Sequence, residues 1–186
     1  LVLDVRPSDL FDFTFPARAL TRGLKLERYL ARALLSHPEK RVRELARKPV
    51  DFRRFSPGFA AVATDIERGE SVLIEEGLFL KALMASSATP IVFPPRMSGD
   101  RLLVDGGVLE PLPTRFLEGK VDISVGVSLE FGNPGKKPGF IHSIVLNTIM
   151  AMGTKIIVVS EKRLDILVKP NMNGIGFWRA GRLEEA

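Results

Sequence analysis

The chain has 186 residues, of which 45% are hydrophobic and 26% are charged, values that fit one soluble globular domain and argue against disorder. It contains no cysteine, which excludes a disulfide framework, a thiolate nucleophile and a cysteine-based metal site. The formal net charge is +5, and the first residues, LVLDVRPSD, do not resemble a signal peptide.

Part of the basic excess is local, in the segment 36–54. The favoured interpretation is a solvated helix face followed by a loop. The alternative is attraction to the anionic headgroups of a membrane surface. We expect no nucleic-acid partner, because the chain has neither zinc-finger spacing nor a basic stretch with interleaved aromatic residues. The basic residues of this segment are Lys40, Arg41, Arg43, Arg47, Lys48, Arg53 and Arg54.

The first elements along the chain are predicted to be helices. Apolar residues recur at helical spacing in LKLERYLARALLS, residues 24–36. His37-Pro38 ends this helix, and a second helix begins at Pro38, which lies in its first turn. We therefore treat 1–54 as a helical segment.

The pattern changes to short β-type runs at 58–66 and 70–76, and the glycine between them predicts a hairpin turn. A helix is predicted over 77–88, ended by Thr89-Pro90. The following IVFPP is extended, and its prolines exclude it from a central strand.

In the second half of the chain, helices alternate with apolar strands. This order predicts an α/β fold with a central, mostly parallel sheet and helices on both faces. We expect one domain over 1–186, in which 55–186 forms the sheet. The predicted elements are strands at 101–105, 121–129 and 164–170, a short helix at 113–119, a helix at 140–155, and the start of a helix at 180.

The most apolar long stretch is 144–160. Asn147 and Lys155 interrupt it, and it is short for a membrane span. We interpret it as a core helix that continues into a further buried segment, which is ambiguous between helix and strand.

Asp105-Gly106-Gly107 is the first candidate for chemistry, because the carboxyl end of a strand is where α/β proteins usually bind ligands. The glycines allow a sharp exit from the strand and close approach of another backbone or a substrate. From spacing alone an ordinary Asp-Gly turn is favoured.

The other candidates are weaker. Asp65 is best explained as a turn carboxylate that accepts hydrogen bonds from its own backbone. Ser86 and Ser87 do not lie in Gly-x-Ser-x-Gly, so neither is expected to be a nucleophile. His37 and His142 have no partner at ligand spacing, so we expect no metal site, and no phosphate-binding glycine motif is present.

Taken together and in order, three segments resemble the patatin-like phospholipase family. They are FAAVATDIERGESVLIEEGLFLKALMASSATPIVFPP at 59–95, RLLVDGGVLEPLP at 101–113, and DILVKPNMNGIGFWRAGRLEEA at 165–186. One mild departure is Glu110, where the family often has asparagine. The resemblance is clear from about Leu24 to the end of the chain.

The resemblance implies a serine hydrolase that cleaves carboxylic esters of phospholipids or other acyl-ester lipids through a Ser–Asp dyad, with no cofactor. It implies a patatin-like three-layer fold. By this analogy Asp105 is the dyad aspartate, within the motif Asp105, Gly106 and Gly107. The family's Gly-x-Ser-x-Gly elbow and its glycine-rich oxyanion loop do not occur in these 186 residues, so the nucleophile is expected upstream.

Two hypotheses follow. In the first, the intact protein is a cytoplasmic lipid acyl hydrolase, with or without peripheral membrane contact, and this chain is a part that is inactive and poorly soluble alone. In the second, the chain is a non-catalytic relic or a lipid-surface binding module without the nucleophile. The chain begins with Leu1 and its last residues look like the start of a helix, which predicts that it is part of a longer protein. The oligomeric state is left open.

Overall fold

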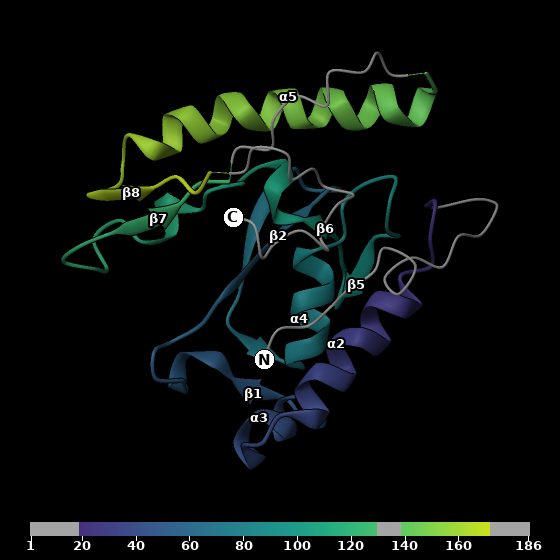
Figure 1. Ribbon diagram of the computed structural model, residues 1–186, viewed down its shortest axis with the longest axis vertical. Helices are drawn as coiled ribbons and strands as arrows, with labels where there is room; N and C mark the ends of the chain where they lie inside the picture. Colours follow the sequence, from purple (N-terminus) through teal and green to yellow (C-terminus); the bar gives the residue numbers. More distant parts are fainter. Residues whose placement is uncertain (1–18, 130–138, 172–186) are drawn as a thin grey trace. The chain divides into compact units, whose positions relative to one another are not determined.

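The computed structural model describes residues 19–129 and 139–171 and has a mixed α/β fold, as the sequence predicts (Figure 1). These residues divide into two compact units. We call 19–109 the N-terminal unit, and 110–129 with 139–171 the C-terminal unit. The predicted helix start at 180 and the first eighteen residues of the predicted helical segment lie outside the described residues, and the single domain over 1–186 stays a prediction.

The N-terminal unit contains a sheet of four strands in the order β3-β2-β6-β5 (Figure 1). The strands are β2 (Ala61–Asp65), β3 (Glu70–Ile74), β5 (Arg96–Ser98) and β6 (Arg101–Asp105). Three of the four confirm the predicted strands, whereas β5 is not foreseen by the sequence analysis. The prolines of IVFPP do keep 91–95 out of the sheet, as predicted.

All pairings in this sheet are antiparallel, which corrects the expectation of a mostly parallel sheet. Short loops join β2 to β3 and β5 to β6, and such loops connect only antiparallel neighbours. The antiparallel pairing of β2 with β6 has another origin, because β3, helix α4 (Phe79–Ser86) and β5 lie between these strands along the chain. Gly69, between β2 and β3, and Gly99, between β5 and β6, have φ of 67° and 62°. This left-handed conformation favours glycine and lets the chain reverse within a short loop.

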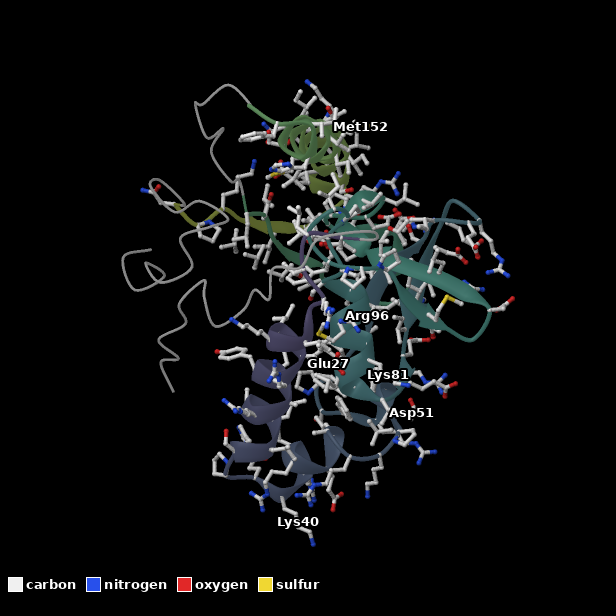
Figure 2. The ribbon with its side chains drawn as sticks, turned by 90° about the vertical axis from the view of Figure 1, so that its right-hand side faces the viewer. Glu27, Lys40, Asp51, Lys81, Arg96 and Met152 are labelled. Carbon is white, nitrogen blue, oxygen red and sulfur yellow. The ribbon has the colours of Figure 1, made fainter. Side chains whose placement is uncertain are left out.

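Two helices cover the N-terminal unit in successive layers (Figure 1). Helix α4 (Phe79–Ser86) packs on β2 and β6, where the small side chains of Ala63 and Ala85 are buried against each other. Helix α2 (Leu24–Ser36) matches its prediction and packs on α4. An ion pair of 3.4 Å between Arg96 of β5 and Glu27 of α2 ties the helix to the sheet (Figure 2).

A cluster of phenylalanine rings forms a second core in the same unit. Phe52 is completely buried in a 3₁₀ turn (Phe52–Arg54), and its ring meets the ring of Phe79 edge-on at 5.3 Å. The flanking strand β1 (Val50–Asp51) pairs with β4 (Glu76–Gly77). The end of the segment predicted to be helical is therefore a short strand and turn, fixed by burial of Phe52. Helix α3 (Lys40–Leu45) begins two residues after Pro38, where the second helix is predicted to start.

The C-terminal unit is a parallel β-α-β arrangement, as the alternating pattern predicts (Figure 1). Strands β7 (Val125–Val127) and β8 (Ile166–Val168) pair in parallel, and helix α5 (Ile141–Glu161) connects them along the chain. A 3₁₀ turn (Thr114–Phe116) stands in place of the short helix predicted at 113–119. Val125 and Val127 are more than half exposed, so β7 lacks the burial on both faces that the mostly apolar run at 121–129 would predict.

Helix α5 corrects the interpretation of 144–160 as a buried core helix with a separate segment after it. It is one continuous helix of 21 residues with many exposed apolar side chains, among them Ile141 at 75% and Met152 at 63% (Figure 2). Within the described residues it is the one helix long and apolar enough to cross a membrane by length and composition. The strands before and after α5 pair with each other in parallel, which favours a crossover helix. A single membrane crossing would leave these two strands on opposite sides of the bilayer.

Candidate active site

Asp105 is the last residue of β6 and lies opposite Ala63 of β2. Its backbone N–H donates to the carbonyl of Ala88, 3.0 Å away, so the strand ends against the loop that follows α4. The carboxylate is partly buried and is held at both oxygens. Oδ2 accepts from the Thr89 hydroxyl at 2.8 Å, and Oδ1 accepts from the Gly107 backbone N–H at 2.8 Å.

The charge of Asp105 is not neutralised by an ion pair with any of the residues that the structure describes. A carboxylate offers about four lone-pair sites, of which the Thr89 and Gly107 donors use two. A partly exposed, charged carboxylate with spare acceptor capacity can accept a further hydrogen bond. This arrangement suits a residue that receives a proton from a neighbouring hydroxyl group.

The two glycines after Asp105 are required for different reasons. A Cβ at Gly106 would collide with the backbone carbonyl of Val62 on β2, with the carbonyl carbon only 2.8 Å away. A Cβ at Gly107 would lie 3.1 Å from Oδ1 of Asp105 itself. Gly106 therefore permits the close approach of another backbone that the sequence predicts, whereas Gly107 leaves room for the carboxylate and donates to it.

The loop that carries Thr89 is braced on both sides. Phe93 N–H donates to the Thr89 carbonyl at 2.9 Å. The carbonyl of Val92 accepts from the backbone N–H and the hydroxyl of Thr21, both at 3.0 Å. Between them Ile91 has a φ of 73°, a costly conformation for a β-branched residue. Such a conformation persists only where the surrounding contacts define it, so the loop is a rigid support.

Asp65 has the turn role that the sequence predicts. Its Oδ1 accepts from the backbone N–H groups of Glu67 at 3.1 Å and Arg68 at 3.3 Å. Its side chain is completely buried, and Oδ2 pairs with the Arg68 guanidinium at 2.8 Å, an ion pair that the sequence analysis does not foresee. The hydrogen bond from Arg68 lowers the pKa of Asp65. This saturated, paired carboxylate is a structural element of the hairpin.

The remaining sequence candidates do not join Asp105 within the described residues. Ser86 ends α4, and Ser87 is exposed immediately after it. His37 lies at the end of α2, where Nδ1 accepts from the Glu39 N–H at 3.2 Å. His142 stacks on Phe140 at the start of α5. In the part of the chain that the structure describes, no three His, Asp or Glu side chains gather to hold a metal ion.

A second hydroxyl–carboxylate pair lies in the C-terminal unit and is missed by the sequence analysis. The Ser124 hydroxyl donates to Asp165 Oδ2 at 2.7 Å, and the Ser124 N–H donates to the same oxygen at 2.8 Å. The Asp165 N–H donates back to Ser124 Oγ at 3.0 Å. These bonds lower the pKa of Asp165, with the hydroxyl of Ser124 as the main cause. Because these two residues are 41 positions apart in the chain, no local sequence motif predicts their contact.

Comparisons with known proteins place these features in a family. The sequence profile of the patatin-like phospholipase family matches residues 4–117, which include Asp105 and its supporting loop. The match does not reach the segment 165–186 on which the resemblance also rested.

Similar proteins include uncharacterized NTE family proteins of mycobacteria. One from Mycobacterium tuberculosis is 39% identical over 88 residues, which are 47% of this chain and 24% of that protein. A second from the same species is 30% identical over 112 residues, which are 58% of this chain and 16% of that protein. A Mycobacterium bovis protein matches as the first one does. The match thus spans less than a quarter of the length of these relatives. Because the family profile covers more than half of the residues, the chain belongs to the patatin-like phospholipase family, a family of lipid hydrolases.

Proposed function

We propose that the intact protein is a lipid acyl hydrolase that cleaves carboxylic ester bonds through a Ser–Asp dyad, with Asp105 as the aspartate. The proposed substrates are phospholipids, lysophospholipids or related acyl esters. The nucleophilic serine and the oxyanion donors are proposed to lie in sequence outside these 186 residues. Family membership supports the reaction class, and the surroundings of Asp105 support its role.

The observation that carries the proposal is the state of the Asp105 carboxylate. It stands at the end of a strand, is oriented by the Thr89 hydroxyl and the Gly107 N–H, and has no cation paired with it among the described residues. Asp65 has the opposite surroundings, with complete burial and an arginine partner. Of these two motif carboxylates, Asp105 is the one with charge and lone pairs available for a reacting group.

The proposed chemistry follows from these properties. The serine hydroxyl donates its hydrogen bond to Asp105 and transfers its proton to the carboxylate as Oγ attacks the ester carbonyl carbon. The tetrahedral oxyanion collapses, the ester C–O bond breaks, and the leaving alcohol takes the proton from Asp105. Water then attacks the acyl-serine and gives a proton to the same carboxylate. As this second tetrahedral intermediate collapses, the bond from the acyl carbon to serine Oγ breaks, Oγ takes the proton from Asp105, and the fatty acid and the free serine are released.

Asp105→Asn in the intact protein tests this proposal. The amide keeps the shape of the side chain but removes the base, so we expect kcat/KM on a short-chain p-nitrophenyl ester to fall by about 10²- to 10⁴-fold. Asp122→Asn, the same chemical change at an exposed site, is the matched control and should retain wild-type turnover. Full activity in Asp105→Asn would reject the assigned role.

A second candidate function is binding to an anionic membrane surface through the segment 36–54. Lys48 and Arg53 are paired with Glu44 and Asp51 at 3.0 and 2.9 Å. In contrast, the exposed side chains of Lys40, Arg41 and Arg47 form no ion pair within the described residues. These three charges favour contact with anionic headgroups, at about 1 kcal/mol for each basic residue near the surface.

Vesicle pelleting tests this second function. We expect binding to vesicles that contain phosphatidylserine at low salt, loss of that binding at high salt, and weaker binding after joint substitution of Lys40, Arg41 and Arg47 by glutamine. A triple substitution of Arg22, Arg28 and Arg32 by glutamine removes equal charge from another region and is the matched control. Binding that is absent, or equal in both variants, would contradict a role for this segment.

A further inference from the structure

We propose that Thr89 is a positioning residue, which holds the carboxylate of Asp105 in the orientation that a reacting hydroxyl group needs. This inference rests on the proposed role of Asp105 and adds a residue to that site. The carrying observation is the hydrogen bond of 2.8 Å from Thr89 Oγ1 to Asp105 Oδ2.

Thr89 is the one side chain that donates to Asp105 among the residues that the structure describes. The other donor, the Gly107 N–H, belongs to the turn that Asp105 itself begins, so it holds Oδ1 but lets the carboxylate pivot about that bond. The Thr89 hydroxyl fixes the second oxygen. With both oxygens held, the remaining lone pairs of the carboxylate point in defined directions.

The backbone reinforces this role, because adjacent residues of one loop hold both the main chain and the side chain of Asp105. The Ala88 carbonyl accepts from the Asp105 N–H at 3.0 Å, while the Thr89 hydroxyl reaches the carboxylate. Thr89 N–H in turn donates to the Ser87 carbonyl at 2.8 Å. Ala88 therefore holds the main chain of Asp105, and Thr89 holds its carboxylate.

The strained residue Ile91 explains how Thr89 keeps its place. The Leu20 N–H donates to the Ile91 carbonyl at 2.6 Å, and the Thr21 N–H donates to the Val92 carbonyl at 3.0 Å, so backbone bonds alone fix this part of the loop. Val92 is 1% exposed and anchors the loop in the core. A loop held in a costly conformation by this many contacts limits the motion of Thr89.

The Thr89 hydroxyl has a second conceivable role, as the nucleophile itself, because it already donates to a carboxylate. The described surroundings favour positioning. Thr89 precedes Pro90 in a loop whose backbone is held by the Phe93 N–H at the Thr89 carbonyl, and its hydroxyl already donates to Asp105. Identification of the residue labelled by a fluorophosphonate decides between these roles.

The experiment uses the intact protein with three variants. Thr89→Val removes the hydroxyl group and keeps the β-branched shape, and Thr89→Ser keeps the hydroxyl group. Thr21→Val is the matched control, since it also removes one buried hydroxyl bond to the same loop, but it keeps the Thr21 N–H bond to Val92 and removes no bond to Asp105. For each, kcat, KM, the fluorophosphonate labelling rate per folded molecule and the thermal midpoint are measured, together with the turnover of Asp105→Asn.

We expect Thr89→Val to lower kcat and the labelling rate about tenfold with KM unchanged, because a misdirected base affects the reacting geometry and not substrate affinity. Thr89→Ser should restore both rates, and Thr21→Val should lower the thermal midpoint while both rates stay at the wild-type level. If Thr89→Val folds poorly, Thr89→Ala is scored by its labelling rate per folded molecule.

Wild-type rates in Thr89→Val, beside an inactive Asp105→Asn, would overturn the positioning role and leave the proposed dyad intact. An equal decrease of kcat and of the labelling rate in Thr89→Val and Thr21→Val would also overturn the positioning role, since the effect would then be structural. A label on Thr89 itself would replace positioning by direct attack. An active Asp105→Asn would reject the proposed function instead.

Discussion

The two units contain hydroxyl–carboxylate pairs of nearly equal length but different surroundings. Thr89 reaches Asp105 at 2.8 Å in the N-terminal unit, and Ser124 reaches Asp165 at 2.7 Å in the C-terminal unit. The Ser124 oxygen also accepts from the Asp165 N–H, and its residue is 9% exposed. The Ser124 hydroxyl therefore uses both its proton and a lone pair in hydrogen bonds to Asp165. We call this pair a clasp, because it links the residues that directly precede the parallel strands β7 and β8.

The Thr89–Asp105 pair makes fewer hydrogen bonds between its two residues. Its single hydrogen bond runs in one direction, and the carboxylate is held at both oxygens without an ion pair to any described residue. The distance between a hydroxyl group and a carboxylate therefore does not identify a catalytic pair. The number and direction of the surrounding hydrogen bonds distinguish a structural clasp from a site with capacity left for chemistry.

The largest difference between the two units is expected in the stability that each loses when one of its glycines, Gly106 or Gly126, is replaced by alanine. A Cβ at Gly106 would meet backbone atoms of Val62, whereas a Cβ at Gly126 would meet only side-chain atoms of Leu164. The Val62 backbone cannot move without disturbing its pairing with Leu73 of β3, but a leucine side chain can change rotamer. We expect Gly106→Ala to cost more than about 3 kcal/mol and Gly126→Ala less than about 1.5 kcal/mol.

Amide hydrogen exchange in the intact protein measures the two costs separately. The Asp105 amide, bonded to Ala88, reports on the N-terminal unit, and the Ile166 amide, bonded to Ser124, reports on the C-terminal unit. A loss of more than about 3 kcal/mol corresponds to over a hundredfold faster exchange at Asp105. Equal losses in both variants would show that the contact with Val62 is as adaptable as the one with Leu164.

A smaller effect is expected from acid. The pKa of Asp165 is lowered from its ordinary value of 3.8 by the Ser124 hydroxyl, so the carboxylate stabilises the folded state above pH 3.8. That stabilisation is lost as the pH falls from 3.8 through the lower folded value. Protection of the Ile166 amide, corrected for intrinsic exchange, should therefore fall more steeply below pH 4 in the wild type than in Asp165→Asn.

Two other carboxylates frame this measurement. The pKa of Glu161 is also lowered, mainly by its hydrogen bond from Lys169, so Asp165→Asn should keep part of the acid dependence. Asp122→Asn, the same chemical change at an exposed site, is the matched control for the substitution itself. Identical slopes in the wild type and Asp165→Asn would show that the clasp contributes nothing to the pairing of β7 with β8.

Local patterns predict the elements that local forces determine. The amphipathic spacing of α2 and the apolar run before Asp105 appear in the structure at the predicted residues. β5 is missed because its three residues follow a proline pair and carry no alternation long enough to detect. The antiparallel pairing of β2 with β3 and of β5 with β6 follows from their short connections. The prediction of a parallel sheet rested instead on the alternation of helices and strands in the second half of the chain.

Only part of the site could be predicted. Asp105 and its glycines form a recognisable motif. The steric need for glycine at position 106, however, comes from the backbone of Val62 on β2, 44 positions earlier in the chain. Thr89 donates a hydrogen bond to a carboxylate 16 positions away. The sequence analysis used Thr89 only as the residue that ends a helix before Pro90. Contacts between distant residues are set by packing, so a single sequence does not reveal them.

The central claim is that Asp105, and not the other hydroxyl-bonded aspartate, serves the reaction. The most direct measurement is the rate at which a fluorophosphonate labels the intact protein in the wild type, in Asp105→Asn and in Asp165→Asn. We expect Asp105→Asn to lose labelling by about 10²-fold or more, and Asp165→Asn to be labelled at the wild-type rate. Retained labelling in Asp105→Asn, with loss in Asp165→Asn, would contradict this account.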